Sequence, residues 1–253
     1  ISQTIPFLFV MATHHTKTQK SKTLEKKLLG QIPASFPENT EYEPFFHLNG
    51  FSYGNLQIIT MDKPEVIQSA QWGIIPNWAT HNPDVFRKKS NTLNARSESI
   101  FEKPSFKKSA EEKRCLILAD GFYEPHHENR KAIPYFCFQP SEEYPDGDLF
   151  LFAGLYNELD DNSLTTTILT TEANDFFAEI HNQKKRMPLI LDENYMEDWL
   201  DEKTSTQSIN ELMATGFTNK AFNAHPVSRD LYKKGINTNK PYIIEPIKKD
   251  TLF

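Results

Sequence analysis

Cysteine is scarce in this chain of 253 residues, which contains only Cys115 and Cys137. Each lies inside an apolar run, so two buried thiols are expected rather than a disulfide framework. This excludes a small secreted domain held together by disulfides. A reducing, cytoplasmic compartment is the expected location.

Long apolar runs are also missing. The N-terminal run Ile5 to Val10 has no basic segment before it and no clear cleavage site, so no signal peptide is expected. No stretch reaches the roughly 20 apolar residues that span a bilayer, so no membrane partner is expected. The hydrophobic fraction of 38% and the 19 phenylalanines still provide ample material for a folded core.

The chain has no excess of positive charge, since its formal net charge is −6. Non-specific binding to a polyanion is therefore disfavoured, because phosphate contacts need clustered lysine and arginine. Local basic clusters do occur, at Arg87 to Lys89, at Lys103, Lys107 and Lys108, at Lys113-Arg114 and at Lys184 to Arg186. Taken singly, each is better explained as a solvated face.

Metal-binding motifs are missing as well. The adjacent pairs His14-His15 and His126-His127 are the only paired imidazoles, and no H-E-x-x-H motif or cysteine cluster accompanies them. Neighbouring residues of a strand point to opposite faces, so such a pair does not converge on one ion. A zinc hydrolase is therefore disfavoured, and neither a metal nor a cofactor is expected.

Most of the chain reads as short β-prone runs with few long helices between them. Strands are expected at Leu56 to Met61, Gln68 to Ile75, Arg114 to Ala119, Pro134 to Phe138, Leu149 to Tyr156, Thr165 to Thr171 and Met187 to Leu191. Helices are expected at Lys20 to Leu29, Asn174 to Ile180, Glu193 to Leu200 and Thr206 to Ala214. This pattern favours a single β-rich α+β domain over a doubly wound parallel sheet.

Two tryptophans flank a glycine and a proline in the segment Gln71 to Trp78. Trp72 lies within an expected strand and is expected in the core. Trp78 follows the proline, and it is as compatible with burial as with an exposed surface on which a base stacks.

A polar run places Asn94 and Arg96 two residues apart. On an extended backbone these side chains point to the same side, so they can address one phosphate or one oxygen-rich ligand together. The alternative is that Asn94 caps a following helix, and the run alone favours that alternative.

Two ionisable residues lie beside apolar strands. Glu124 follows a strand and a turn and is flanked by aromatic residues and Pro125, which predicts a partly desolvated carboxyl suited to acid/base work. His181 lies at the end of an expected helix, where the helix C-terminus raises a pKa and the neighbouring cations lower it. In isolation, an exposed glutamate and a structural histidine are the commoner cases.

In this order, the segments resemble the signature of the SRAP family, the SOS response-associated peptidase-like proteins that act on abasic sites in single-stranded DNA. The matching motifs are W-G-x-x-P-x-W, N-A-R-S-E, R-C-x-x-x-x-D-G-F-Y-E and I-H-x-x-x-x-R-M-P-L-I-L. The resemblance extends from Met11 to Pro246, and ordered motifs of this length make a chance match improbable.

The resemblance implies an SRAP-like domain at residues 11–253 behind an N-terminal extension at residues 1–10. It implies a monomer with a barrel-like core of mostly antiparallel strands, helices around it and a basic groove for single-stranded DNA with abasic sites. The implied catalytic residues are Asn94, Glu124 and His181. Asn94 would hydrogen-bond the reacting oxygen, Glu124 would move protons at the amine, and His181 would act as the acid at the sugar hydroxyl. The implied DNA contacts are Trp78, Arg96, Lys107, Lys184 and Arg186.

The chain departs from the family pattern at Ala12. In the family, an N-terminal cysteine freed of its methionine condenses with the aldehyde of an abasic site and closes a thiazolidine ring. His14 to Lys17 resemble the residues after that start, which aligns Met11 with the methionine and Ala12 with the cysteine. Alanine has no thiol and ten residues precede Met11, so the peptidase and lyase-like reactions are not expected of the chain as written.

Three interpretations of Ala12 are open at this point. A version of the chain with a cysteine there carries out the chemistry, or the chain is a pseudoenzyme that binds DNA without reacting. In the third, the amine of Ile1, with a pKa of about 8, forms a reversible imine with the aldehyde.

Overall fold

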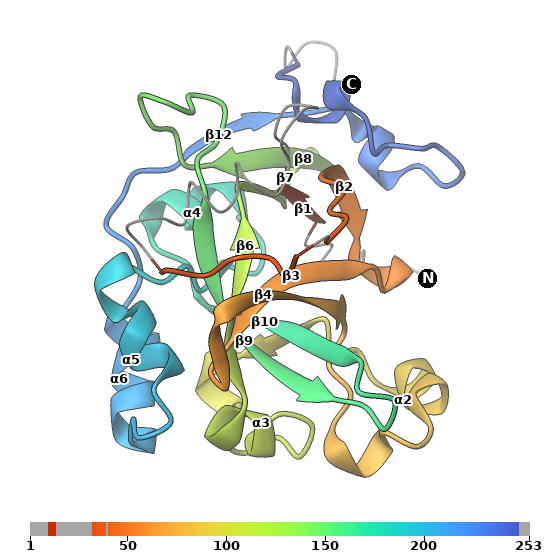
Figure 1. Cartoon of the computed structure of the whole chain (residues 1–253). Coiled ribbons are helices and arrows are strands. Elements are labelled where there is room, and N and C mark those ends of the chain that lie inside the picture. The colour runs from red at the N-terminus through yellow and green to blue at the C-terminus, as the bar shows by residue number, and fades with distance from the viewer. Residues whose placement is uncertain (1–9, 14–31, 39, 248–253) are drawn as a thin grey trace.

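Two β-sheets dominate the computed structural model, which describes residues 10–13, 32–38 and 40–247 (Figure 1). The expected helix at Lys20 to Leu29 and the amine of Ile1 lie outside these residues. The seven-stranded sheet contains β3 (Asn55–Thr60), β4 (Lys63–Trp72), β5 (Asn94–Arg96), β6 (Arg114–Ala119), β9 (Phe150–Glu158), β10 (Leu164–Glu172) and β11 (Arg186–Pro188). The five-stranded sheet contains β1 (Val10–Thr13), β2 (Phe45–Asn49), β7 (Gly121–Glu128), β8 (Lys131–Phe138) and β12 (Asn223–Pro226).

The larger sheet closes into a ring. β10 pairs antiparallel with β9 and parallel with β4, and the ring continues through β3 and β6 back to β9. Beyond the ring, β10 continues and pairs with β5 and then with β11. Most pairings are antiparallel, so the expected β-rich α+β architecture with a barrel-like core is confirmed.

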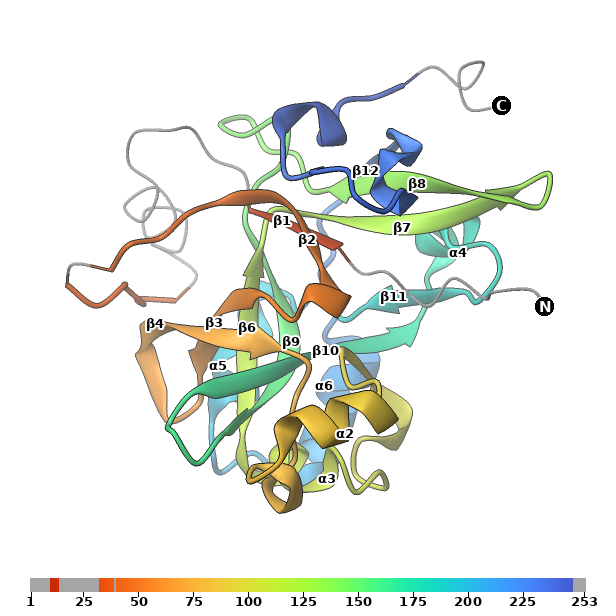
Figure 2. The same ribbon diagram turned by 90° about the vertical axis from the view of Figure 1, so that its right-hand side faces the viewer.

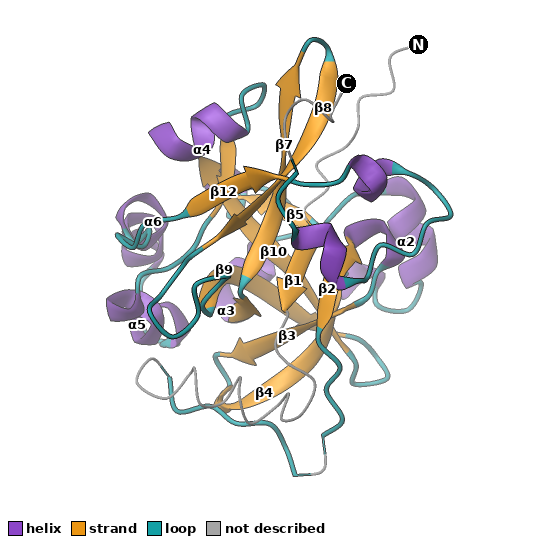
Figure 3. Cartoon of the chain, turned by 90° about the horizontal axis from the view of Figure 1, so that it is seen from above, coloured by secondary structure: helices purple, strands orange, loops and turns teal. Residues whose placement is uncertain are grey.

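Short helices surround the strands, as the view from above shows (Figure 3). They are α2 (Pro83–Lys89), α3 (Lys107–Glu112), α4 (Asp175–Ile180), α5 (Met196–Leu200) and α6 (Thr206–Thr215). The bounds of α4 and α6 agree with the expected helices to within one residue, whereas the helix expected from Glu193 begins with a 3-10 turn and α5 starts only at Met196. Helices α2 and α3 were not expected. Within the described ranges, no helix is long and apolar enough to cross a membrane.

Strand β6 explains why the core has two compartments. Cys115 and Ile117 face one apolar cluster that also contains Trp72, whereas Leu116 and Leu118 face a second cluster that contains Trp199 of α5. All of β6 is buried, and full burial of each aliphatic side chain stabilises the fold by about 1.5–3 kcal/mol. The strand is therefore apolar on both faces rather than alternating.

Several expected boundaries were wrong. Glu124 follows strand β6 and a bend at Asp120, as expected, but it lies on a strand that was not expected, β7, because Phe122 to Glu128 pairs with β8 and Gly121 to Tyr123 pairs with β1. The strand expected at Met187 to Leu191 ends at Pro188, and its last residues form only isolated bridges. The strand expected from Gln68 instead begins at Lys63, because it forms a hairpin with β3.

Candidate functional site

A buried carboxyl group forms the centre of the candidate site. Glu124 is 1% exposed, and its Oε1 atom has no hydrogen-bond partner among the described residues. Burial raises the pKa of Glu124 well above its ordinary value, because the charged form would lose its hydration. The group therefore keeps its proton at a pH where an exposed glutamate is ionised, which goes further than the partial desolvation that the sequence predicts.

His181 contacts this carboxyl group. It is the C-terminal cap of α4, a helix that begins where the side chain of Asn174 accepts a hydrogen bond of 3.0 Å from the amide of Phe177. Its Nδ1 lies 3.0 Å from the carbonyl oxygen of Arg186 and 3.2 Å from Oε2 of Glu124. A carbonyl can only accept, so Nδ1 carries a proton and donates it there.

Burial lowers the pKa of His181 to about 4, and the charges of Lys184 and Arg186 act in the same direction. The carbonyl of Arg186 partly opposes this shift, and a helix as short as α4 does not reverse it. Both shifts thus favour the uncharged forms, a protonated carboxyl beside a neutral imidazole, over a salt bridge. This arrangement provides a proton donor and a proton acceptor in one buried site.

The contact between β7 and α4 fixes the position of the pair. The side chain of Asn182 accepts from the amide of His127 at 2.9 Å and donates to its carbonyl at 2.8 Å. Nδ1 of His126 lies 3.1 Å from the carbonyl oxygens of Glu179 and Ile180. Because these bonds join the strand to the end of the helix, His181 is held against Glu124 without relying on their mutual contact.

No described group of three or more histidine, cysteine, aspartate or glutamate residues could hold a metal ion. His126 and His127 are successive residues of β7, and each is bonded to a different part of the segment 179–182. His14 and His15 lie outside the described residues. The adjacent histidines of β7 thus serve the contact between strand and helix.

Strand β1 carries position 12 next to β7. In the backbone register, Ala12 is opposite Gly121 and Val10 is opposite Tyr123. On its other side, β1 pairs with β2, where Met11 is opposite Leu48 and Thr13 is opposite Phe45. Two residues of β2, Phe46 and His47, thus face the single residue Ala12 across a β-bulge, a feature that is common next to active sites.

Asn94 and Arg96 lie on strand β5, opposite Ile168 and Thr170 of β10. They are two residues apart on an extended backbone, and the cap that the run alone favours is not formed, since the residue before the following 3-10 turn is Arg96. Arg96 is exposed, whereas Asn94 is half-buried and its Oδ1 atom has no partner in the described chain. Asn94 is connected to the Glu124–His181 pair through β10 and Arg186 rather than by a direct bond.

Arg186 forms that connection. Its guanidinium donates to both carboxylate oxygens of Glu98, at 2.5 and 3.0 Å, and to the carbonyl of Thr170 at 2.7 Å. Burial raises the pKa of Glu98, but the hydrogen bonds and charge of Arg186 outweigh it and leave the pKa below its ordinary value. The charge of Arg186 is therefore largely paired within the protein.

The remaining residues expected to contact DNA do not gather in one place. Lys184 is exposed in the loop beside His181. Trp78 is 58% exposed and packs edge-to-face on Phe86 of α2, while Lys107 is the first residue of α3. Helices α2 and α3 lie at the end of the ring of strands away from β7 and α4 (Figures 1 and 2). Trp72 is fully buried, as expected.

Neither cysteine is available as a nucleophile. Both thiols are buried, and burial raises the pKa of Cys115 to about 12 and the pKa of Cys137 well above its ordinary value. The Sγ atom of Cys115 lies 3.5 Å from the hydroxyl of Thr166 inside the core. A thiolate is the reactive form, so both residues are inert in the folded chain.

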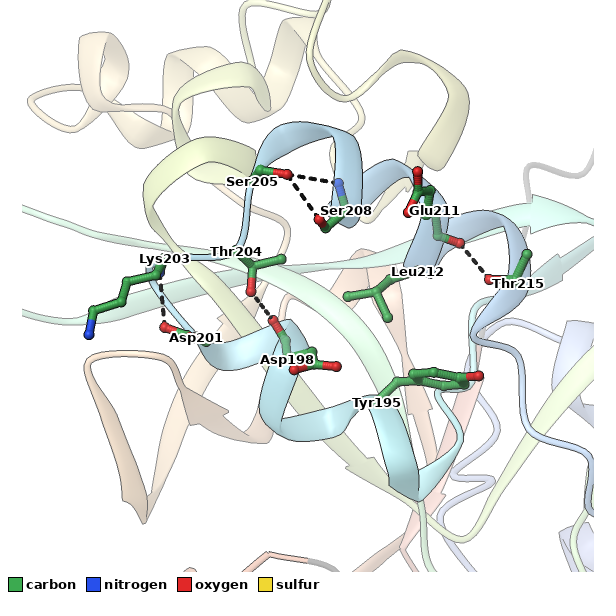
Figure 4. A pocket seen from close by; sticks show the side chains of 10 residues that line it. All are labelled: Tyr195, Asp198, Asp201, Lys203, Thr204, Ser205, Ser208, Glu211, Leu212 and Thr215. Carbon is green, nitrogen blue, oxygen red and sulfur yellow. Dashed lines mark hydrogen bonds between the residues drawn. The ribbon is translucent and has the colours of Figure 1, made fainter.

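Among the cavities that the described residues line, two lie away from the Glu124–His181 pair, and the sequence patterns indicated neither. The first, which we name the edge cavity, measures about 700 Å³ and lies between residues 47–52 and residues 231–239. The second, about 550 Å³, lies between α5 and α6 and is drawn in Figure 4. The carboxylates among its lining residues, Asp198, Asp201 and Glu211, disfavour an anionic ligand.

Comparisons with known proteins agree on one family. The family model described as "SOS response associated peptidase (SRAP)" matches residues 11–234. Abasic site processing protein YoaM of Bacillus subtilis is 32% identical over 202 residues, which are 78% of this chain and 83% of that protein. Abasic site processing protein HMCES of Gallus gallus is 31% identical over 204 residues, 72% of this chain and 58% of that protein.

Solved structures give the same result for the fold. A Bacteroides thetaiotaomicron protein matches with a TM-score of 0.69 and 32% identity, covering 80% of this chain and 85% of that one. A Bordetella bronchiseptica protein matches with a TM-score of 0.64 and 23% identity, covering 87% of this chain and 99% of that one. At that identity, the second match concerns the fold alone.

Proposed function

The chain belongs to the SOS response associated peptidase family, and from this premise we propose that it recognises abasic sites in single-stranded DNA during the response to DNA damage. Its relatives YoaM and HMCES are named for the processing of abasic sites. The proposal takes residues 11–253 as one domain behind an extension at residues 1–10. It also takes the protein to act as a monomer in the cytoplasm.

The observation that carries the proposal is the contact of 3.2 Å between the buried side chains of Glu124 and His181, with Glu124 on β7 next to β1, the strand that holds position 12. An abasic nucleotide exposes an aldehyde and a hydroxyl group where other nucleotides have a base. A protonated carboxyl donates to an aldehyde oxygen, and a neutral imidazole accepts from a hydroxyl. We assign these roles to Glu124 and His181, and we assign to Asn94 a hydrogen bond to the sugar oxygen.

Arg96 and Lys184 are the proposed phosphate contacts, because both are exposed. Arg96 lies on β5, which pairs with β10, and Lys184 lies in the loop that follows His181. Trp78 is the proposed stacking surface for a base, since an exposed indole offers a flat apolar face. Lys107 and Arg186 are weaker candidates. The former is on α3, at the far end of the ring of strands, and the latter is paired with Glu98.

We propose recognition without a stable cross-link for the chain as written. Closing a thiazolidine ring requires a thiol and an amine on one residue, and Ala12 has no thiol. The buried Cys115 and Cys137 do not replace it. An amine alone forms an imine with an aldehyde by releasing water, and water reverses that step. Neither a peptidase nor a lyase activity is therefore part of the proposal.

The test compares two single-stranded oligonucleotides that differ only in one abasic nucleotide. Fluorescence anisotropy with the full chain should give tighter binding to the abasic oligonucleotide, and Asn94→Ala should weaken that preference. Glu111→Gln, an exposed change on α3, is the matched control. Equal affinity for both oligonucleotides would contradict the proposal.

Denaturing electrophoresis separates the modes of binding. No shifted band is expected after incubation with the abasic oligonucleotide alone. A band that appears only after borohydride reduction would identify an imine, and a band without reduction would show that a stable covalent bond forms despite Ala12.

A further inference from the structure

We propose that Asn182 is a positioning residue for the recognition of abasic sites, because it holds the chain on either side of His181 against β7 and so keeps the imidazole beside Glu124. This inference rests on the proposed function, since it takes the abasic nucleotide as the ligand of that pair. The sequence patterns assigned no role to Asn182, and the predicted site residues do not include the adjacent histidines of β7, His126 and His127.

The carboxamide of Asn182 takes the place of a strand partner. Its oxygen accepts from the amide of His127 at 2.9 Å, and its nitrogen donates to the carbonyl of the same residue at 2.8 Å. Both backbone groups of His127 therefore point away from β8, toward the other edge of β7. In the described chain, β1 pairs with that edge only from Gly121 to Tyr123. Asn182 thus satisfies a part of the edge that β1 does not cover.

His126 adds a second attachment one residue earlier on β7. Its Nδ1 lies 3.1 Å from the carbonyl oxygens of Glu179 and Ile180, in the last turn of α4. A carbonyl can only accept, so this nitrogen donates to them. The ring also packs against that of Tyr135, with the centroids 5.2 Å apart. The chain is therefore attached to β7 immediately before and immediately after position 181.

The direct contact between His181 and Glu124 does not do this on its own. The proton on Nδ1 of His181 is donated to the carbonyl of Arg186 at 3.0 Å, and that carbonyl lies at the end of the same loop. Oε2 of Glu124 lies 3.2 Å from the same nitrogen, so a single N–H is shared by two acceptors. A shared N–H holds each acceptor less firmly than an unshared one. The distance between imidazole and carboxyl thus depends on the attachments of Asn182 and His126.

The far end of the loop is attached to a different strand. The amide of Ala173 donates to the carbonyl of Lys185 at 3.0 Å, and β11 then pairs with β10. Helix α4 contacts both β7 and β11 and lies beside them in Figure 2. Removing the side chain of Asn182 releases the β7 side alone. Lys184, the proposed phosphate contact, then stays attached through β10, while the imidazole of His181 can move away from β7.

An abasic nucleotide senses this movement, whereas an intact one does not. Because Nδ1 of His181 carries the proton, Nε2 is the atom that accepts from a hydroxyl group of the ligand. The carboxyl of Glu124 donates to an oxygen of the same nucleotide in the proposed function. Hydrogen bonds weaken steeply with distance and angle, so one ligand bonds to both groups only when their spacing is fixed. A nucleotide that keeps its base has neither free oxygen.

The experiment measures fluorescence anisotropy of the full chain with the intact and the abasic oligonucleotide. Asn182→Ala should lower the preference for the abasic oligonucleotide by about fivefold or more, the equivalent of one lost hydrogen bond. Asn174→Ala is the matched control, since it removes the same carboxamide from the other end of α4, where it accepts from the amide of Phe177. The control should lower the thermal midpoint and leave the preference unchanged.

A spectroscopic measurement tests the position of the imidazole directly. Burial lowers the pKa of His181 to about 4. In Asn182→Ala the ring should gain contact with water, so its pKa should rise toward the ordinary value of 6.5 in an NMR titration. Asn174→Ala should titrate as the wild type does. His126→Phe keeps a ring against Tyr135 but removes the donor, and it should shift the titration in the same direction as Asn182→Ala.

The outcomes separate this inference from the proposed function. An unchanged preference for abasic DNA in both Asn182→Ala and His126→Phe overturns the positioning role and leaves the function in place. An equal loss of preference in Asn174→Ala and Asn182→Ala also overturns it, because Asn182 then only stabilises α4. If the wild type shows no preference, the proposed function fails. A pKa of His181 that rises in Asn182→Ala alone would still show in that case that Asn182 positions the imidazole.

Discussion

Oε2 of Glu124 lies 3.2 Å from Nδ1 of His181, and folding shifts the pKa values of these two groups in opposite directions. Each shift favours the neutral form, because burial penalises the carboxylate and the imidazolium alike. The relationship gives the stability of the protein a pH dependence that can be assigned to single residues.

His181 should make the fold less stable in acid. Its pKa falls from an ordinary value of about 6.5 to about 4, so the unfolded chain binds the proton more tightly. The contribution of neutral His181 to the free energy of unfolding is complete above pH 6.5. It is lost as the pH falls toward 4, and the loss is about 3 kcal/mol at most. Urea unfolding of the wild type and His181→Gln between pH 4 and 8 should show a smaller acid loss in the variant. His47→Gln should remove a separate part of the loss, since the pKa of His47 is also lowered to about 4.

Glu124 should act in the opposite direction. The pKa of Glu124 rises on folding. The contribution of the protonated carboxyl to the free energy of unfolding is therefore complete when the pH is below the ordinary pKa of 4.5, and it is lost as the pH rises toward the pKa of the folded state. Glu124→Gln imitates the neutral carboxyl and cannot ionise. The free energy of unfolding of the variant minus that of the wild type should therefore be larger at pH 8 than at pH 4. An identical pH dependence in both proteins would mean that Glu124 ionises freely in the folded state.

Arg186 should contribute to structure more than to phosphate binding. It donates to both oxygens of Glu98 and to Thr170, and lysine lacks the planar fork that makes these bonds together. Arg186→Lys should lower the thermal midpoint and change the salt dependence of DNA binding little. Lys184→Ala should show the reverse, with an unchanged midpoint and a shallower salt slope. A large change of the salt slope in Arg186→Ala, with unchanged stability, would assign Arg186 to the DNA instead.

Substitutions of the two tryptophans in the W-G-x-x-P-x-W motif should have different effects, one on the stability of the fold and the other on DNA binding. Trp72 is fully buried and its indole nitrogen donates to the carbonyl of Leu93 at 2.8 Å, so Trp72→Ala should cost about 3–5 kcal/mol. Trp78→Ala should change the free energy of unfolding by less than about 1 kcal/mol, because the side chain is 58% exposed. Its effect should appear in the affinity for single-stranded DNA, measured under the same conditions.

Restoring a thiol at position 12 should restore cross-linking only when that residue has a free amine. The thiazolidine ring forms from one aldehyde, one amine and one thiol with loss of water. Ala12→Cys in the full chain should therefore give no stable band on a denaturing gel. The same variant, with the residues before position 12 removed by a protease, should give one. A stable band from the uncleaved variant would show that the thiol alone is sufficient.

The sequence predicts local structure well where short-range rules decide it. Asn174 is a strong N-cap, and α4 begins directly after it. Trp72 is buried, as its expected strand predicts, whereas the motif leaves the exposure of Trp78 open and the structure decides it. The polar run of Asn94 and Arg96, in contrast, favours a helix cap when it is taken alone, whereas the structure places both residues on strand β5.

The sequence fails where distant pairing decides the structure. No strand is expected at Glu124, but Pro125 is the register partner of Pro134, so both missing amides fall at one position of the β7–β8 ladder. The tertiary pairing overrides the local preference. The contact of Glu124 with His181 and the walls of the edge cavity likewise join segments that no local pattern relates.

Strand β10 also determines when the protein can fold during its synthesis. It closes the ring by joining β4 to β9, and it then receives β5 and β11. Until the ribosome has released residues 164–172, the nascent chain exposes the apolar edge of β9 and the unpaired end of β4 at residues 70–72, and unpaired edges are sites of aggregation. Truncated translation products that end before Leu164 should therefore depend on chaperones, whereas those that end after Pro188 can already complete the ring.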